Sequence, residues 1–196
     1  MKELLAADKA GVEESGARSL LENAIAVGPQ TGKARLGEDE LTSDLFILFV
    51  AGTDTTANTL AFGTWYLMNN AEARDKLKKE LREAIPDPKS KQLKSWQELE
   101  QLPYLTAVIK ESLRFSFGAA HRMARVSPDT EHVVDGHRLP PGTLICHSNS
   151  VYQMSEKYFQ DADKFIPERW LDANSRDLEH NLISFPRGPR SCIGQK

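Results

Sequence analysis

The sequence predicts a mainly α-helical protein with small β-sheets, an α+β fold, and three features support this prediction. An acidic cluster at Glu38–Glu40 precedes a long apolar stretch that continues to Met68, as in a buried helix. Two further stretches repeat apolar residues at helical spacing. After Gly118, short runs bounded by proline and glycine are typical of strands. The 196 residues, 40% of them hydrophobic, can build one sizeable core, so one domain is expected.

Within that domain, residues 1–37 precede the main part, residues 38–196. Lys2–Ile25 suits one or two polar helices, and Gly28–Lys33 is expected to be a flexible linker. The main part opens with the long helix, in which polar residues are few. A helix of this kind is expected to be buried on most sides.

Two amphipathic helices are expected next. The first covers about Ala71–Ile85 and ends at Pro86, because proline does not continue a helix. The second begins at Pro103, a residue favoured in the first turn, and stops near Gly118. Its apolar stripe consists of Leu105, Val108, Ile109 and Leu113.

Small β-sheets in the second half complete the predicted fold. Strands are expected at Glu131–Asp135 and Thr143–His147, with Pro140–Gly142 between them. From Asp161 to Ser184 the sequence becomes an irregular, charged meander.

Composition and charge limit the possible functions. A formal net charge of -3 and a pI near 6.0 argue against a polyanion-binding face, so nucleic acid is not an expected partner. The two cysteines, Cys146 and Cys192, are too few for a disulfide scaffold and lack zinc-site spacing, which favours a reducing compartment. The amino terminus lacks the apolar stretch of a signal peptide. The longest apolar run, Leu45–Ala51, is too short to span a bilayer.

The segment Phe185–Gly194 places Cys192 in a loop suited to a thiolate metal ligand. Positive side chains favour the ionised sulfur, and glycines let the backbone approach a large flat ligand closely. These residues are Arg187, Arg190, Gly188 and Gly194. The alternative is a surface turn with a free thiol.

A second polar motif interrupts the long apolar helix at Ala51–Thr56. Uncompensated polar groups in a buried helix cost about 1–3 kcal/mol each, so their presence needs a reason. Gly52 and a threonine hydroxyl can open the helix locally beside a ligand. Alternatively, Thr55 and Thr56 bond to backbone carbonyls and Asp54 caps a broken helix.

A third motif pairs Glu111 with Arg114 on the helix that begins at Pro103. Their spacing of three puts them on one face, but an exposed pair adds only about 0.2–0.5 kcal/mol. Because the surrounding helix is apolar, a buried pair needs further partners to offset desolvation. Arg169, in the segment Phe165–Trp170, is a candidate.

Taken in order, these segments resemble motifs of the cytochrome P-450 family. The loop matches F-x-x-G-x-R-x-C-x-G, the helix matches A/G-G-x-D/E-T-T/S, and E-x-x-R and P-E-R follow the family order. The resemblance extends from about Glu38 to the end of the chain. It implies the carboxy-terminal portion of that fold, with a long central helix, an E-x-x-R helix, a meander and a cysteine loop.

The resemblance also implies roles for particular residues. Cys192 is expected to be the axial thiolate ligand of haem b, and Asp54 and Thr55 are the expected catalytic proton relay for dioxygen. Ala51 and Gly52 would lie over the haem face. The remaining expected cofactor-binding residues are Phe185, Gly188, Arg190, Gly194 and Arg125.

Structural support is expected from a triad of Glu111, Arg114 and Arg169 that locks the meander and so positions the cysteine loop. Arg125 and Arg190 are assigned to the two haem propionates, with Arg122 as the alternative to Arg125. His121 lies in the same segment, where a histidine is more often simply solvated.

The implied activity is a fungal-type haem-thiolate monooxygenase that acts on a small hydrophobic substrate, with electrons from NADPH through a reductase. Secondary metabolism is the expected context. The full-length protein is expected on the cytoplasmic face of the endoplasmic reticulum membrane, held there by an amino-terminal part outside this chain. This chain alone is expected to be soluble and cytoplasmic if it folds.

Three alternatives compete with this interpretation. The first alternative is that the chain is a truncated, catalytically inactive part of such an enzyme, so that these 196 residues alone are expected to be inactive. A reductase-independent haem-thiolate isomerase or dehydratase is disfavoured, because Asp54 and Thr55 are both present. The non-enzyme alternative is a helical interaction module with a reactive cysteine.

Overall fold

The computed structural model describes residues 37–87, 94–127, 130–172 and 175–195. The helices expected at Lys2–Ile25 and the linker expected at Gly28–Lys33 lie outside the described residues. The chain divides into two compact units, Met1–Asp54 and Thr55–Lys196, and the boundary falls inside one long helix. The expected division at residue 37 stays a prediction.

That helix, α3 (Glu38–Asn69), is continuous, and three acidic residues occupy its first turn as predicted. The expectation that it is buried on most sides is wrong. Large apolar side chains such as Phe46, Phe49 and Trp65 are exposed, because among the described residues only Tyr66 and Leu67 near its end join a core cluster. By length and composition α3 could cross a membrane, but core helices of soluble proteins meet the same criterion.

The two predicted amphipathic helices are present, as α4 (Ala71–Ala84) and α6 (Pro103–Ser116). The Asn70 side chain caps the start of α4 by accepting a hydrogen bond from the backbone N–H of Ala73. A short helix, α5 (Trp96–Glu100), was not predicted; it starts with a capping box formed by Ser95 and Glu98. Helix α6 (Pro103–Ser116) lacks a side-chain cap from its own N-cap residue. Instead, the Glu80 carboxylate of α4 accepts hydrogen bonds from its first amides, at 2.8 Å each.

The core lies on both sides of α6. On one side, Tyr104, Val108 and Phe115 pack with Phe165. On the other side, Ala107 packs with three buried residues of the meander, which are Phe159, Ala162 and Trp170. The predicted stripe is therefore only partly right: Val108 is buried, whereas Ile109 is 49% exposed.

The second half of α3 crosses α6 closely at Gly63. A Cβ atom at this glycine would collide with Oγ of Ser112, so only glycine fits there without a shift. Near the crossing, Thr59 Oγ1 donates to Ser116 Oγ at 2.9 Å, and Asn58 Nδ2 donates to the Ser116 carbonyl at 3.3 Å. Packing and hydrogen bonds thus join the two helices directly.

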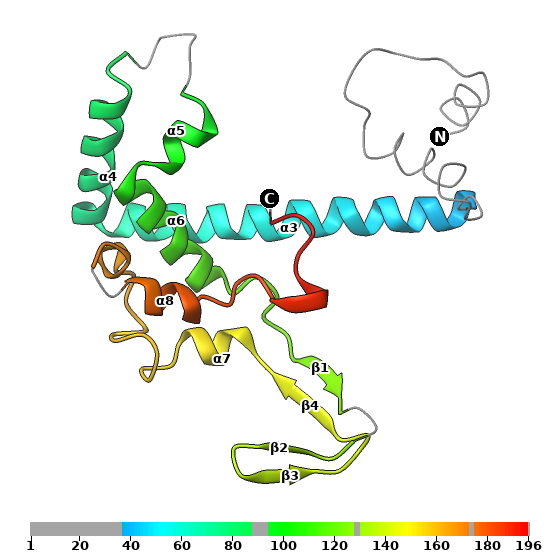
Figure 1. Ribbon diagram of the computed structural model, residues 1–196. Helices are drawn as coiled ribbons and strands as arrows, with labels where there is room; N and C mark the ends of the chain where they lie inside the picture. The colour runs from blue at the N-terminus through cyan, green and yellow to red at the C-terminus, as the bar shows by residue number, and fades with distance from the viewer. Residues whose placement is uncertain (1–36, 88–93, 128–129, 173–174, 196) are drawn as a thin grey trace. The chain divides into compact units, whose positions relative to one another are not determined.

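Within the described residues, four short strands form two antiparallel pairs (Figure 1). Strand β1 (Met123–Val126) pairs with β4 (Leu144–His147), and β2 (His132–Val134) pairs with β3 (His137–Leu139). Both predicted strands exist, as β2 and β4, but neither β1 nor β3 was predicted. The hairpin β2–β3 turns at Asp135 and Gly136, which both have positive φ values of 49° and 78°. Pro140–Gly142 therefore connects β3 to β4.

The rest of the chain is a meander that contains short helices. These are α7 (Asn149–Gln153), η1 (Pro167–Trp170), α8 (Ser175–Asn181) and η2 (Gly188–Arg190). Lys110 of α6 forms an ion pair with Glu179 of α8. The meander is therefore attached to α6, the same helix that carries the predicted triad.

Candidate functional site

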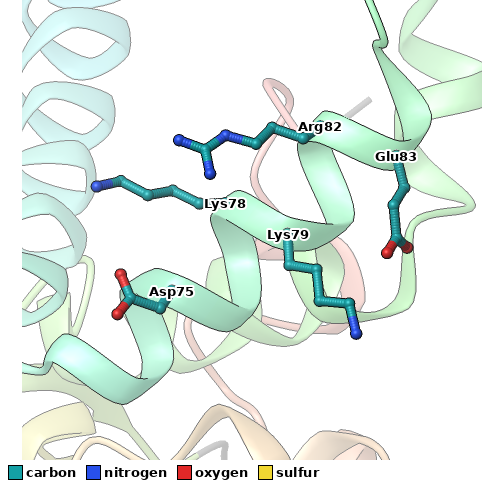
Figure 2. Close-up of a pocket in the computed structure, with 5 residues that line it drawn as sticks. All are labelled: Asp75, Lys78, Lys79, Arg82 and Glu83. Atoms are coloured by element: carbon teal, nitrogen blue, oxygen red, sulfur yellow. The ribbon is translucent and has the colours of Figure 1, made fainter.

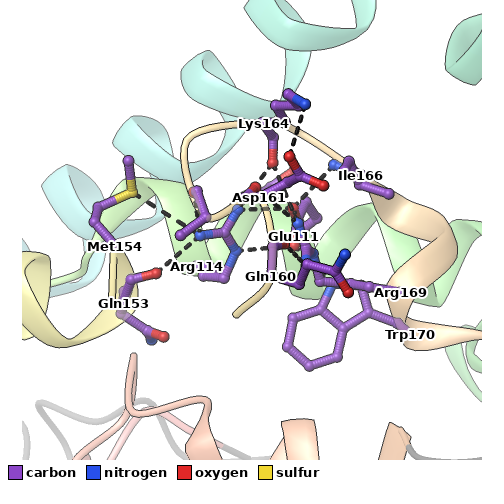
Figure 3. A network of polar contacts seen from close by, with 12 residues as sticks. Glu111, Arg114, Gln153, Met154, Gln160, Asp161, Lys164, Ile166, Arg169 and Trp170 are labelled. Carbon is purple, nitrogen blue, oxygen red and sulfur yellow. Dashed lines mark hydrogen bonds and ion pairs between the residues drawn. The ribbon is translucent and has the colours of Figure 1, made fainter. Parts of the chain in front are cut away.

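The predicted pair on α6 forms a buried ion pair with two hydrogen bonds. Glu111 and Arg114 are both 0% exposed. Arg114 Nη2 donates to Glu111 Oε1 at 2.8 Å, and Arg114 Nε donates to Oε2 at 3.1 Å (Figure 3). This two-pronged geometry is the strongest form of an arginine–carboxylate pair. A spacing of three on one helix places both side chains on the same side, as predicted.

Residues from the η1 region supply three more donors to the same carboxylate. Oε1 accepts from Arg169 Nε at 3.2 Å and from the Ile166 backbone N–H at 3.0 Å, while Oε2 accepts from Trp170 Nε1 at 2.8 Å. The predicted triad of Glu111, Arg114 and Arg169 is therefore brought together in space (Figure 3). Burying two cations and one anion is costly, and these hydrogen bonds offset that cost.

Trp170 is a member of this network that sequence reasoning missed. The prediction included it only as the last residue of the segment Phe165–Trp170. A buried indole usually finds a partner for its N–H group, and Trp170 is 5% exposed. The signal was available in the sequence as a tryptophan directly after the candidate Arg169.

The two arginines also bind backbone carbonyls of the meander. Arg114 Nη1 donates to the carbonyls of Gln153 and Ala162, at 2.8 Å each. Arg169 Nη1 donates to the Gln160 carbonyl at 2.7 Å. The network thus attaches this segment to α6. That the triad also positions the cysteine loop stays a prediction.

A second, half-exposed cluster lies around Glu168, the η1 residue next to Arg169. Its carboxylate accepts from Tyr104 Oη of α6 and from Lys76 Nζ of α4, at 2.8 Å each. Burial opposes ionisation of Glu168, but the hydrogen bonds from Lys76 and Tyr104 outweigh it and lower the pKa of this carboxyl. Burial and the bond to Glu168 raise the pKa of Tyr104. The η1 segment is therefore held on both α4 and α6.

The cysteine loop follows this scaffold. Cys192 is a free, exposed thiol, and Gly188, the first residue of η2, has a φ of 83°. An L side chain rarely adopts that backbone conformation, which explains the glycine. A Cβ atom at Gly194 would meet Cys192 Sγ at 3.8 Å. Phe185 is half-buried at the start of the loop.

Arg187, expected from the sequence to favour the ionised thiol, has its hydrogen-bond partners on α8. Its guanidinium lies against α8, where Nη2 donates to the His180 carbonyl at 2.8 Å and Nη1 contacts His180 Nδ1 at 3.1 Å. The carbonyls at a helix end lack intrahelical partners and attract a cation, which competes with the thiolate for this side chain. The side chain of Arg190 lies outside the described part of the structure.

The polar motif on α3 is present as an ordinary helix. The expected local opening at Gly52 and the suggested broken helix at Asp54 are not observed, because α3 continues through both positions. Gly52, Asp54 and Thr55 are exposed. Thr59, one turn further on, donates from Oγ1 to the Thr55 carbonyl at 3.0 Å. That Ala51, Gly52, Asp54 and Thr55 face the cysteine loop stays a prediction.

The propionate candidate Arg125 lies on β1, opposite Ile145 of β4. Its side chain is exposed, and Nη1 donates to the carbonyl of Ala124 at 2.8 Å. Arg122 and His121 are exposed just before the strand. The choice between Arg125 and Arg122 stays a prediction.

Among the described residues, the candidate site offers one protein ligand, Cys192, which suits a metal ion whose other ligands come from a cofactor. Within the described part of the chain, no group of three or more His, Cys, Asp or Glu side chains could hold a metal ion. Cys192 would thus be a lone protein ligand, which suits haem iron because the porphyrin supplies four nitrogens and the protein supplies an axial thiolate.

A surface pocket of about 420 Å³ lies elsewhere, on α4. Figure 2 shows that its lining consists of the charged side chains of Asp75, Lys78, Lys79, Arg82 and Glu83. All five come from one helix and none from the cysteine loop. Small-molecule sites are lined mainly by hydrophobic and aromatic side chains, whereas all five residues here are charged, so this pocket is not assigned to the candidate site.

Comparison with known proteins points to one family. The family model described as cytochrome P450, here written P-450, matches residues 6–196. The match includes the long helix, the Glu111 network and the cysteine loop.

Similar curated proteins come from fungi. Cytochrome P-450 monooxygenase tndB of Aspergillus flavipes is 40% identical over 158 residues, which are 81% of this chain and 32% of the relative. Monooxygenase ankB of Aspergillus thermomutatus is 37% identical over 195 residues, 100% of this chain and 37% of the relative. Monooxygenase oblB of Emericella variicolor is 40% identical over 161 residues, 82% of this chain and 29% of the relative. The chain thus spans about a third of the length of these relatives.

Proposed function

This chain belongs to the cytochrome P-450 family, and from that premise we propose that it forms the haem-site part of a haem-thiolate monooxygenase. The proposed reaction inserts one oxygen atom from dioxygen into a small hydrophobic organic molecule. Family membership confirms the prediction made from the sequence motifs. The names of the fungal relatives, all monooxygenases, support the class of reaction.

The observation that carries the proposal is a free, exposed thiol at Cys192 in the loop that follows a buried scaffold along the chain. The sulfur is free, and the loop around it contains the glycines that a closely approaching flat ligand requires. The scaffold is the Glu111 network on α6, which is fully buried. A metal ligand needs such support, because small shifts of a ligand change metal affinity and reactivity.

In the proposed site, Cys192 Sγ would hold haem b as its thiolate ligand. When bound, the haem supplies the iron chemistry that activates dioxygen, and a thiolate ligand favours O–O cleavage. Phe185 packs at the proximal side, and Gly188 and Gly194 keep the loop backbone close to the ring. Arg190 and Arg125, or Arg122 in place of Arg125, bind the propionates through charge-assisted hydrogen bonds.

In the proposed reaction, residues of α3 provide space and protons. Ala51 and Gly52 have small side chains and leave room for dioxygen. Asp54 and Thr55 hold and deliver the protons that the reaction consumes. Their exposure in α3 is compatible with proton exchange with solvent.

The proposed partners are those of a monooxygenase that receives electrons one at a time. Electrons come from NADPH through a reductase, and the substrate is a small hydrophobic molecule. The proposed location is the cytoplasmic face of the endoplasmic reticulum membrane, and the fungal relatives suggest secondary metabolism as the context.

The chain offers a matched pair of cysteines for the test. The haem-loaded protein is reduced under carbon monoxide, and the thiolate-type Soret band is recorded for wild type, Cys192→Ser and Cys146→Ser. Both cysteines are free and exposed, so the two substitutions are comparable. We expect only Cys192→Ser to lose the band. Haem uptake without that band in wild type, or its loss in Cys146→Ser alone, contradicts the proposal.

A further inference from the structure

Ser184 is the residue directly before Phe185, where the cysteine loop begins, and it is buried. Its Oγ donates to the Leu113 carbonyl in the last turn of α6 at 2.8 Å. The same carbonyl also accepts from Ser116 Oγ of α6 at 3.2 Å, so it is shared between the helix and the loop. The serine therefore attaches the start of the cysteine loop to α6.

Gln153 contacts the same serine from the opposite side. It is 0% exposed, at the end of α7, and its Nε2 donates to Ser184 Oγ at 3.3 Å. Because the serine proton is directed at Leu113, the hydroxyl must accept at this second contact, which requires the amide nitrogen of Gln153. Gln153 Oε1 is buried and has no hydrogen-bond partner in the structure. The amide orientation is thus set by Ser184 rather than by its own oxygen.

The same glutamine also belongs to the Glu111 network. Its backbone carbonyl accepts from Arg114 Nη1 at 2.8 Å (Figure 3). One residue therefore receives a hydrogen bond from the triad through its main chain and gives one to Ser184 through its side chain. A continuous chain of hydrogen bonds runs from Glu111 through Arg114 and Gln153 to the loop.

Close packing adds to these bonds. Gly118, just after α6, has a φ of 59°, and a Cβ atom there would lie 3.0 Å from the Ser184 carbonyl oxygen. The backbone at Ser184 is thus confined by a glycine that has little room for a side chain. Three residues further on, the Arg187 side chain binds the end of α8. The loop is held at two points before it reaches Cys192.

We propose that Gln153 and Ser184 form a latch that positions the cysteine loop, by joining the Glu111 network to the residue at the loop entrance. They are positioning residues, since they act on Cys192 through the backbone between Ser184 and the thiol. Only the predicted effect of the latch on bound haem depends on the proposed function. In the haem-free chain it predicts a local restraint on residues 185–194.

The first experiment measures amide hydrogen exchange of residues 185–194 in the haem-free chain. Ser184→Ala removes the hydroxyl, and Gln153→Met removes the donor but keeps the backbone carbonyl that binds Arg114. Ser112→Ala is the matched control, because Ser112 is a buried serine of α6 whose Oγ donates to the Val108 carbonyl and not to the loop. We expect exchange in the loop to rise about tenfold in the two latch variants and to stay unchanged in the control.

The second experiment measures the fraction of thiolate-type Soret band in the reduced carbon monoxide complex. We expect this fraction to fall in Ser184→Ala and Gln153→Met and to be restored in Ser184→Thr, which retains a hydroxyl. Equal exchange in Ser184→Ala and Ser112→Ala, or no rescue by threonine, overturns the latch. A wild-type protein without the thiolate band contradicts the proposed function, while hydrogen exchange still decides the latch.

Discussion

The Glu111 network and the polar stretch of α3 are two family motifs with opposite surroundings. Both carboxylate oxygens of Glu111 accept hydrogen bonds from more than one donor, and the ion pair with Arg114 is fully buried. In α3, Asp54 and Thr55 are exposed on a continuous helix. The difference teaches that one motif is buried among contacts with the meander, whereas the other presents its side chains at the surface of a helix. Substitutions should therefore separate stability from reactivity.

The largest effect on stability is expected from Glu111→Gln. It leaves Arg114 and Arg169 without an anion in a buried site, and the new amide N–H₂ would face their donors. We expect the free energy of unfolding to fall by about 3–5 kcal/mol, measured by denaturant titration. Glu100→Gln at the exposed end of α5 is the control. A loss below about 1 kcal/mol would show that the network is not a structural centre.

A smaller loss is expected from Trp170→Phe. The phenylalanine ring retains the aromatic packing near Phe159 but cannot donate to Glu111 Oε2. Loss of a hydrogen bond to a charged group should reduce the free energy of unfolding by about 1.5–3 kcal/mol. Trp96→Phe, at a tryptophan that is 69% exposed, should change it by less than about 0.5 kcal/mol. Equal effects of the two substitutions would remove Trp170 from the network.

The half-exposed Glu168 cluster should give a still smaller, pH-dependent effect. Its folded-state pKa lies below the ordinary value of 4.5, so its contribution is present above pH 4.5 and is lost as the pH falls through the folded-state value. Wild type should therefore lose stability below about pH 4.5 more steeply than Glu168→Gln, by less than about 1 kcal/mol. Thermal unfolding at several pH values measures the slope, with Glu83→Gln on α4 as control. Parallel slopes in all three proteins would contradict the assignment.

The smallest effect on stability is expected from Thr55→Ala, although this change should alter the reaction. Because the residue is exposed in a helix, the free energy of unfolding should change by less than about 0.5 kcal/mol. In the haem-loaded enzyme, loss of the hydroxyl should divert reducing equivalents to hydrogen peroxide, measured as peroxide released per NADPH consumed. Thr56→Ala is the neighbouring control. Unchanged coupling would exclude Thr55 from the proton relay.

Much of the scaffold was predictable because its signals are local. Proline positions indicate where α4 ends and where α6 begins, and helical spacing indicates the pair of Glu111 and Arg114. The strand pairing was not predictable in this way, because it depends on a turn with positive φ at Asp135 as well as Gly136, and few non-glycine residues signal that conformation. The residue types within the strands therefore do not indicate which strands pair.

The site was only partly predictable for a different reason. The motif pattern indicated Arg169, but the contributions of Trp170 and Gln153 depend on which buried donors the fold brings to one place. Arg187 could not be assigned from the sequence, since the end of α8 competes for its side chain. Exposure of α3 also differed from the prediction, because apolar residues alone do not show which elements cover them.

The close crossing at Gly63 has a mechanical consequence. At Gly63, α3 passes so close to α6 that a Cβ atom would collide with Ser112 Oγ, and Thr59 and Asn58 donate hydrogen bonds to Ser116 at the end of α6. A displacement of α3 near Thr59 should therefore be transmitted to the end of α6.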